Sequence, residues 1–296
     1  MNILITGATG FLGSHILKGL IKNTSYNIIV VKRTFSDVWR IKDLINNNRI
    51  KFYDIDKCDL ENVFQENNIN LIIHCATSYG RTDNSSYSVL ETNLMLPVKL
   101  LDLSVKYGVQ GFINTDSYFN KDNMSYSYLL NYALSKKSLL LWLKHFSKKI
   151  KTVNMVLEHI FGEDDRDDKF VTKMLNLIAL KKVPSVDLTS GEQKRDFIYV
   201  DDVVKAYLKV INFMNEHSFR YRTFDVGTGS TLSIKDFVSA VKLISDSPTK
   251  LNFGALPYRE DEIMCSCADI VDLVDIGWTP EYNVNTALMK IIGENK

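Results

Sequence analysis

Tyr132 and Lys136 are the residues whose types and spacing most directly suggest chemistry, because a phenol is followed four positions later by an amine. On a helix this spacing places both side chains on one face. A free phenol has a pKa of about 10, which suits acid–base work near neutral pH poorly. A neighbouring ammonium favours the phenolate and lowers that pKa. The pair therefore predicts a proton donor and acceptor for a substrate oxygen.

Thr115 ends an apolar run, Gly111 to Thr115, that precedes this helical stretch. A hydroxyl at the end of a strand can bind the same substrate oxygen that the phenol protonates. Thr115, Tyr132 and Lys136 are therefore the predicted catalytic residues.

Three glycines near the N-terminus form a second chemical signal, because they lie between an apolar run and an amphipathic stretch. Glycine permits a tight turn and lets the backbone approach a pyrophosphate, and the start of the next helix offers N–H groups and a positive dipole end. The spacing is G-x-x-G-x-x-G instead of the more general G-x-G-x-x-G. Its position still predicts dinucleotide binding. The predicted contacts are Gly7, Gly10, Phe11, Leu12 and Gly13.

Lys32 and Arg33 end the second apolar run, about 20 residues past the glycines, where NAD sites commonly have an acidic residue for the ribose. Two cations at this place attract a 2′-phosphate, whereas a carboxylate repels it. The pair predicts NADPH (NADP+) as the cofactor. A solvent-exposed basic pair is the alternative.

Short apolar runs alternate with helical stretches through the first half of the chain. Such alternation predicts parallel strands with right-handed crossovers, and continuous apolar strands indicate a sheet covered on both faces. We expect an α/β fold with a doubly wound parallel (Rossmann) sheet and a smaller α/β substrate-binding lobe. The dinucleotide-binding domain is expected at 1–157, with return segments near 197–226, and the lobe at 158–196 and 227–296.

Composition limits the classes of partner. The net charge of +1 over 296 residues gives no reason to expect nucleic acid or a membrane surface as a partner. The four cysteines form no C-x-x-C pair, so no metal site is expected. The start of the chain does not have the pattern of a signal peptide, which predicts a cytoplasmic protein.

Taken together, these features resemble the extended short-chain dehydrogenase/reductases, in the NAD-dependent epimerase/dehydratase family of nucleotide-sugar enzymes. The resemblance covers nearly the whole chain. Its further residues are Asp54-Ile55, His74-Cys75-Ala76-Thr77, Asn93, the segment from Arg195 to Val203, and Gly277-Trp278-Thr279-Pro280.

The resemblance implies roles for individual residues. Asp54 and Ile55 would contact the adenine, and Asn93 would support the backbone of the active site. Arg195 and Arg259 match positions that bind the diphosphate of a nucleotide-sugar substrate. The alternative for both arginines is ordinary surface ion pairing. The remaining cofactor contacts implied are Cys75, Ala76, Thr77 and His159, with Tyr132 and Lys136 contacting the cofactor as well.

The segment Thr115-Asp116-Ser117 bears on the reaction. Dehydratases of the family carry Thr-Asp-Glu here, and a serine cannot remove a C–H proton as the glutamate does. Asp116 and Ser117 are instead assigned to substrate binding. Within the family the chain resembles the 4-reductases of CDP-4-keto-3,6-dideoxyhexoses. The resemblance implies NADPH-dependent reduction of the 4-keto group of a nucleotide-linked deoxysugar, for polysaccharide or O-antigen biosynthesis.

Two other functions stay open. One is an NAD-dependent nucleotide-sugar 4-epimerase or dehydratase. The other is a non-catalytic regulator that senses NADP, against which the Tyr132/Lys136 pair argues. Family members commonly form dimers through the helices that hold Asn93 and Tyr132, so the resemblance implies a homodimer.

Overall fold

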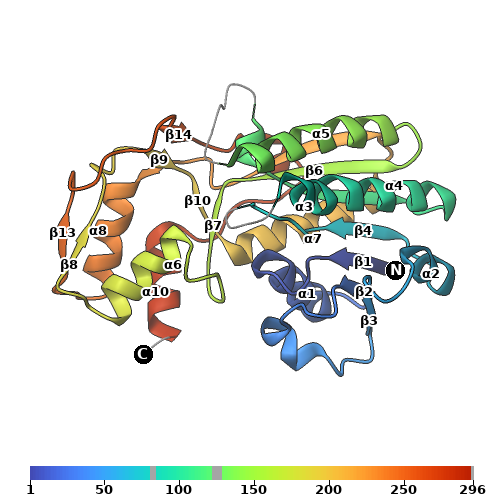
Figure 1. Cartoon of the computed structure of the whole chain (residues 1–296), viewed down its shortest axis with the longest axis horizontal. Helices are drawn as coiled ribbons and strands as arrows, with labels where there is room; N and C mark the ends of the chain where they lie inside the picture. The colour runs from blue at the N-terminus through green and yellow to red at the C-terminus, as the bar shows by residue number, and fades with distance from the viewer. Residues whose placement is uncertain (81–84, 122–128, 295–296) are drawn as a thin grey trace. The chain divides into compact units, whose positions relative to one another are not determined.

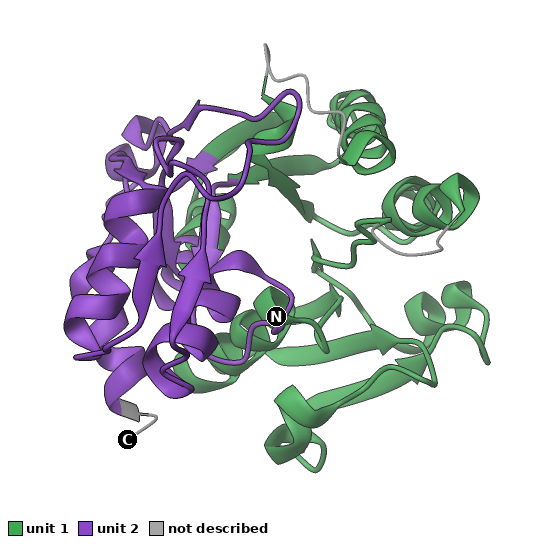
Figure 2. Cartoon of the chain, turned by 60° about the vertical axis from the view of Figure 1, so that its left-hand side comes forward, with its two compact units in different colours: residues 1–123, 128–156, 207–224 green, residues 124–127, 157–206, 225–296 purple. Residues whose placement is uncertain are grey.

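The computed structural model describes residues 1–80, 85–121 and 129–294, which divide into two compact units (Figures 1 and 2). The first unit contains the described parts of 1–156 together with 207–224. The second contains 157–206 and 225–294. Residues 197–206, expected in the dinucleotide-binding domain, lie in the second unit. Helix α7 (Val200–Glu216) begins in the second unit and ends in the first.

A seven-stranded sheet forms the centre of the first unit, in the order β11-β6-β5-β4-β1-β2-β3. The pairings of β1 with β2 and β4, of β2 with β3, and of β4 with β5 are parallel. The strand order reverses direction between β1 and β4, where α/β folds of this type bind their ligands. The predicted doubly wound α/β fold is confirmed. The strands are β1 (Asn2–Thr6), β2 (Asn27–Lys32), β3 (Ile50–Asp54), β4 (Leu71–His74), β5 (Gly111–Ser117), β6 (Lys151–Leu157) and β11 (Tyr221–Val226).

The central strands are continuous apolar runs because both faces of the sheet are covered. Ile3, Leu4 and Ile5 of β1 are fully buried although they point to alternate faces. Helices α4 (Leu96–Lys106) and α5 (Leu130–Phe146) lie on one face, and α1 (Phe11–Asn23) and α7 lie on the other (Figure 1). Helix α2 (Leu60–Glu66) belongs to the same core cluster as α4 and α5.

Short elements complete the first unit. The 3₁₀ turns are η1 (Trp39–Leu44) and η3 (Tyr118–Asn120). Helix α3 (Ser86–Leu90) runs through a π turn, η2 (Glu91–Met95), directly into α4. Single π turns inside helices are frequent at functional sites, and this one carries the fully buried Asn93.

The second unit is also α/β, with small sheets formed by β7 with β10, by β12, β9 and β14, and by β8 with β13. Its aromatic core includes Phe197 stacked on Phe237, with ring centroids 4.2 Å apart. The strands are β7 (His159–Phe161), β8 (Ser185–Asp187), β9 (Lys194–Arg195), β10 (Phe197–Tyr199), β12 (Leu232–Ser233), β13 (Lys250–Asn252) and β14 (Cys265–Ser266). The helices are α6 (Phe170–Met174), η5 (Leu175–Leu180), α8 (Ile234–Ile244), α9 (Val271–Asp275) and α10 (Val284–Glu294).

Asp202 joins two of the sequence motifs inside the second unit. Its carboxylate accepts the backbone N–H groups of Glu281 and Tyr282 at 3.1 and 2.9 Å. Its carbonyl accepts the indole N–H of Trp278 at 3.1 Å. The Gly277–Pro280 motif therefore anchors the C-terminal segment to the start of α7, which is a structural role.

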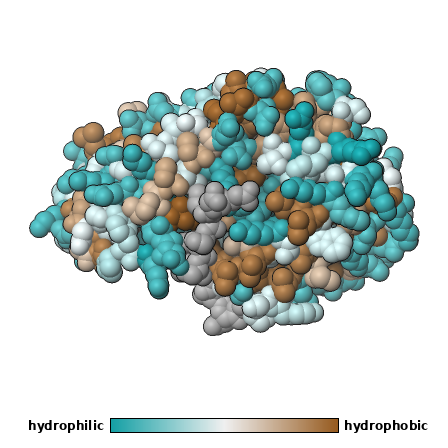
Figure 3. Space-filling view, turned by 90° about the horizontal axis from the view of Figure 1, so that it is seen from above, coloured by the Kyte–Doolittle hydropathy of each residue, from teal (hydrophilic) through white to brown (hydrophobic). Residues whose placement is uncertain are grey.

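Apolar side chains remain exposed on the outer surface of α5, on the face seen in Figure 3. Leu141 is 70% exposed, and Met95 of the adjacent η2 is 62% exposed. We call this surface the α5 stripe; it consists of Leu130, Leu134, Leu141, Trp142 and Met95. Within the described part of the chain, no helix has both the length and the apolar character needed to cross a membrane.

Candidate functional site

The glycine turn is built so that backbone lines it closely. Gly7 has a φ of 70°, and a Cβ there would lie 2.6 Å from the amide nitrogen of Ala76. A Cβ at Gly13 would lie 2.1 Å from the carbonyl oxygen of Gly7. Side chains other than hydrogen are excluded at both positions. The turn therefore leaves a cradle of backbone that fits a pyrophosphate.

The start of α1 is suited to an anion. Gly10 is its N-cap, with no capping side chain, and no acidic residue lies in its first turn. The end of β1 is held against the end of β4, because Thr6 Oγ1 bonds to His74 Nδ1 at 2.8 Å and accepts the N–H of Ala76 at 3.2 Å. The predicted segment from Cys75 to Thr77 thus lies beside the turn.

Lys32 and Asp54 form an ion pair, with Nζ 2.5 Å from Oδ1. The two residues are partners in the register of β2 and β3, and the N–H of Ile55 bonds to the carbonyl of Lys32 at 2.9 Å. The charge of Lys32 is therefore balanced within the chain. Arg33 is exposed, with its guanidinium 4.7 Å from the centre of the Phe35 ring.

Arg40 reaches the glycine turn from η1, although no pattern in the sequence singled it out. Its Nη1 donates to the carbonyl oxygen of Thr9 at 3.4 Å. Its guanidinium lies 4.3 Å from the ring centre of Trp39. A single arginine on a short helical turn gives no recognisable spacing, so only the folded chain connects it to the turn.

Tyr132 and Lys136 lie on the buried face of α5, 4% and 3% exposed. The Lys136 Nζ is 5.8 Å from the centre of the Tyr132 ring and donates to the carbonyl of Thr115 at 2.6 Å. The ring of Tyr79 stacks on Tyr132 with centroids 5.0 Å apart. Tyr79 is a site residue that the sequence did not indicate, since it lies in the loop after β4.

Burial raises the pKa of the Tyr132 phenol well above its ordinary value, and the nearby Tyr79 and Asp116 add to this rise. A hydrogen bond with the Ser117 hydroxyl opposes it. The net direction is thus the opposite of the lowering expected from Lys136. Burial also lowers the pKa of Lys136 itself, against the effect of Asp116. The phenol holds its proton, which suits a general acid.

The Thr115 hydroxyl has two partners within the protein, and its contact with a substrate oxygen stays a prediction. Its Oγ1 is 2.7 Å from Tyr207 Oη and donates to Cys75 Sγ at 3.3 Å. The hydroxyl that neighbours Tyr132 belongs to Ser117. Tyr207 lies on α7, 92 residues after Thr115, and in the sequence it matches the buried apolar spacing of that helix.

Asp116 is occupied by the protein itself. Its carboxylate accepts the N–H of Ser117, Nδ2 of Asn120 and Nδ2 of Asn154, each at 2.8 Å. It is 3% exposed. These three bonds make Asp116 an acceptor within the fold, and its contact with substrate stays a prediction.

Asn93 connects the loop after β4 to α5. Its Oδ1 accepts the N–H of Ser78 at 2.7 Å and the hydroxyl of Thr77 at 3.3 Å. Its Nδ2 donates to the carbonyl of Ser78 at 2.8 Å and to Ser135 Oγ at 3.0 Å. Ser135 directly precedes Lys136, so one side chain fixes both the loop and the helix turn that carries the amine.

The remaining predicted residues lie in the second unit. Arg195 is buried, and its Nη2 bonds to Glu262 Oε1 at 2.6 Å. Arg259 is exposed. Burial, followed by the charge of Arg195, lowers the pKa of His159 to about 3, so this imidazole is neutral near pH 7. An anion bound by Arg195 would have to compete with the carboxylate of Glu262.

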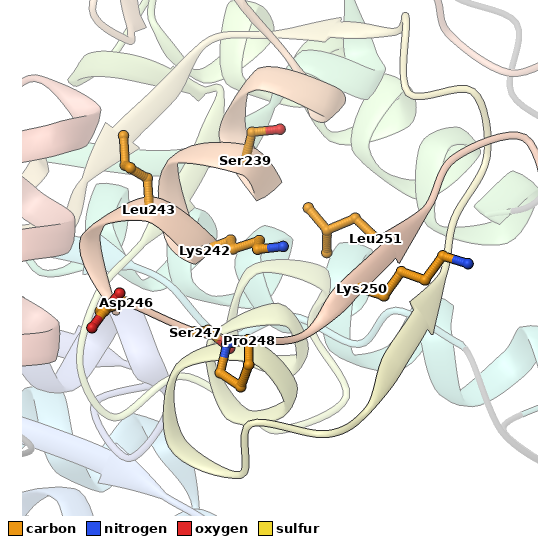
Figure 4. A pocket seen from close by; sticks show the side chains of 8 residues that line it. All are labelled: Ser239, Lys242, Leu243, Asp246, Ser247, Pro248, Lys250 and Leu251. Atoms are coloured by element: carbon orange, nitrogen blue, oxygen red, sulfur yellow. The ribbon is translucent and has the colours of Figure 1, made fainter.

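The described residues form a further hollow outside the predicted site. A shallow hollow beside the end of α8 and β13 contains no predicted site residue (Figure 4); it is lined by Ser239, Lys242, Leu243, Asp246, Ser247, Pro248, Lys250 and Leu251. In the described ranges, no group of three or more His, Cys, Asp or Glu side chains is placed to hold a metal ion.

Known proteins resemble this chain along most of its length. The profile of the NAD dependent epimerase/dehydratase family matches residues 3–227. A CDP-abequose synthase of Salmonella muenchen is 35% identical, covering 98% of this chain and 96% of its own length. The Salmonella typhimurium CDP-abequose synthase is 33% identical over 98% and 97%.

A solved structure shares the fold. The UDP-glucose 4-epimerase of Thermotoga maritima, determined with UDP-glucose, has a TM-score of 0.84 at 24% sequence identity, covering 99% of this chain and 98% of that one. Combined with the glycine cradle and the buried Tyr132/Lys136 pair, the match over residues 3–227 is decisive: the chain belongs to the NAD dependent epimerase/dehydratase family of nicotinamide-dinucleotide enzymes.

Proposed function

We propose that this enzyme reduces the 4-keto group of a nucleotide-linked deoxysugar with NADPH, and that its substrate is a CDP-4-keto-3,6-dideoxyhexose. The observation that carries the proposal is the identity of 35% and 33% with two CDP-abequose synthases over 98% of the chain. The product would be a building block for polysaccharide or O-antigen. The four cysteines are free thiols, which agrees with a reducing cytoplasm.

The residues of the cradle fit the dinucleotide. The backbone of the glycine turn and the uncapped start of α1 would hold the pyrophosphate. Arg33, exposed at the end of β2, is the cation we assign to the 2′-phosphate. We do not assign Lys32 to the 2′-phosphate, because its ammonium already forms an ion pair with Asp54.

Tyr132 supplies the proton in the proposed reaction. Bound NADPH supplies the hydride to C4 of the sugar, and the ketone oxygen must gain a proton to become an alcohol. Burial keeps the Tyr132 phenol protonated until that oxygen carries developing negative charge. The Ser117 hydroxyl is placed to orient the same oxygen, and the buried Lys136 ammonium stabilises the phenolate that remains.

The environment of Tyr132 argues against dehydration. Removing a C–H proton requires a base, and the neighbouring hydroxyl of Ser117 is a poor one. Asp116, the carboxylate that directly precedes Ser117, is buried and already accepts three hydrogen bonds from the chain. A reductase needs only a proton donor, which the site has.

An NAD-dependent 4-epimerase is the second candidate. The ion pair of Lys32 with Asp54 favours it, because it removes one of the two cations that indicated NADPH. A non-catalytic sensor is less consistent with the site, since a sensor has no need of a protonated phenol beside a buried ammonium.

The test is a screen of CDP-, dTDP-, UDP- and GDP-linked 4-keto sugars, in which NADPH absorbance is followed. We expect consumption of NADPH with a CDP-linked 4-keto-3,6-dideoxyhexose and little with the other nucleotides. Interconversion of 4-hydroxy nucleotide sugars without added reductant, together with NAD retained through purification, would establish the epimerase instead.

We also propose that the enzyme is a homodimer joined through the α5 stripe. Large apolar side chains rarely gather on the surface of a monomer unless they form an interface. Leu130, Leu134 and Leu141 of the stripe lie on the same helix as Tyr132 and Lys136, but on its exposed face, and Met95 lies on the adjacent η2.

A further inference from the structure

We infer that Tyr207 is a positioning residue of the active site, which holds Thr115 and thereby the ammonium of Lys136. The inference rests on the proposed function only for the choice of substrate, because a 4-epimerase would use the same Tyr132 and Lys136.

Tyr207 is fully buried on α7, and its hydroxyl is 2.7 Å from Thr115 Oγ1. Thr115 Oγ1 in turn donates to Cys75 Sγ at 3.3 Å. A hydroxyl has one hydrogen, so Thr115 must accept from Tyr207 when it donates to Cys75. The bonds therefore run in one direction, from α7 through β5 to the segment after β4.

The backbone of Thr115 carries the second half of the connection. Its carbonyl oxygen accepts the hydrogen bond from Lys136 Nζ at 2.6 Å. The register of β4 with β5 ends at His74 and Asn114, one residue before Thr115. The hydrogen bonds of the Thr115 side chain thus restrain this residue where its pairing with β4 has stopped, and its carbonyl stays aimed at the amine.

The charged state of Lys136 depends on this arrangement. The groups facing the amine are Asp116 on β5, Cys75 and His74 at the end of β4, and Tyr132 on its own helix. Burial lowers the pKa of Lys136, while Asp116 and Cys75 act in the opposite direction. A displaced Thr115 carbonyl would remove an acceptor for the ammonium, so its pKa would fall further.

The experiment compares Tyr207→Phe with a matched control, Tyr221→Phe. The control also removes one tyrosine hydroxyl bonded to a threonine, since Thr223 Oγ1 donates to Tyr221 Oη at 2.9 Å in the same unit. Each variant is assayed on whichever reaction the wild-type enzyme catalyses, and kcat, KM and the pH profile of kcat are measured.

For Tyr207→Phe we expect kcat to fall on the order of tenfold, as misplacement of a catalytic group by a fraction of an ångström allows. KM should change little, and the alkaline decline of kcat should begin at lower pH because Lys136 loses its proton sooner. Tyr221→Phe should keep the wild-type kcat and pH profile. Thr115→Val should lower kcat and shift the pH profile as Tyr207→Phe does. Thr115→Ser keeps the hydroxyl and should therefore retain most of the wild-type kcat.

A Tyr207→Phe enzyme that matches Tyr221→Phe in kcat and pH profile overturns the inference. If Tyr207→Phe does not fold, Thr115→Val decides in the same way, because it breaks the same bond from the other side. The double variant Tyr207→Phe/Thr115→Val gives a further test. If its loss of kcat equals the product of the two single losses, the two hydroxyls act independently, which would also overturn the inference. The identity of the substrate that is turned over tests the proposed function. The ratio of kcat between variant and wild-type enzyme tests the role of Tyr207.

Discussion

The phenol of Tyr132 is the proposed proton donor, and its surroundings determine whether it holds its proton. It is stacked under Tyr79, 4% exposed and beside a hydroxyl instead of a carboxylate. Burial and the neighbouring Tyr79 favour the neutral phenol, which the proposed ketone reduction needs at the start of each turnover, whereas the Ser117 hydroxyl acts in the opposite direction. In the proposed reaction, the buried ammonium of Lys136 stabilises the phenolate that remains after Tyr132 has given up its proton.

Replacing Tyr132 with phenylalanine tests the acid role. We expect turnover to fall roughly 10²–10⁴-fold, the usual effect of losing a general acid. The dissociation constant for NADPH, measured by fluorescence titration, should change by less than about threefold, since only a hydroxyl is lost. Near-normal turnover in this variant would remove Tyr132 from the proposed mechanism.

Arg33 is the residue on which the choice of NADPH now depends. Arg33→Ala should raise the KM for NADPH about tenfold or more, because a hydrogen bond between charged groups contributes about 1.5–3 kcal/mol. The KM for NADH is the internal control and should stay nearly constant. Equal changes for both cofactors would show that Arg33 does not contact the 2′-phosphate.

The limits of sequence reasoning at this scale are physical. The i, i+4 relation of Tyr132 and Lys136 is local, so helix geometry alone predicted it. The pairing of Lys32 with Asp54 depends on the register of β2 and β3, and the contact of Thr115 with Tyr207 spans 92 residues. Both contacts changed the expected role of a residue, and neither leaves a pattern in the sequence.

Among the elements, the first strand, turn and helix were the most predictable, because apolar periodicity and glycine spacing are encoded locally. The π turn that carries Asn93 was not, since it differs from an α-helix only in hydrogen-bond pattern. The boundary inside α7 could not be predicted either, because one continuous amphipathic helix serves two units.

The glycine turn allows a graded test. Gly13→Ala should abolish detectable NADPH binding or unfold the enzyme, because its Cβ would lie 2.1 Å from the Gly7 carbonyl oxygen. Gly10→Ala is the control, since its Cβ would lie 3.3 Å from the same atom and needs only a small adjustment. Melting temperature and NADPH titration separate the two effects. Equal tolerance of both substitutions would contradict the described turn.

For the whole molecule, the α5 stripe makes the oligomeric state testable. Leu134→Lys combined with Leu141→Lys should convert the proposed dimer to a monomer, because two charges would have to be buried in an apolar interface. Leu243→Lys is the control, on a leucine 81% exposed in the second unit. Sedimentation velocity gives the mass of each. A wild-type monomer, or a dimer that survives both charges, would refute this interface.

The environment of Cys75 has a practical consequence for chemical labelling. Burial raises the pKa of its thiol to about 11, so near pH 7 only about one molecule in 10⁴ carries the thiolate that alkylating reagents attack. Burial and neighbouring carboxylates also raise the pKa of Cys58. Cys265 and Cys267 are exposed. A maleimide dye should therefore attach to the second unit first, giving a fluorescent reporter without removing any native cysteine.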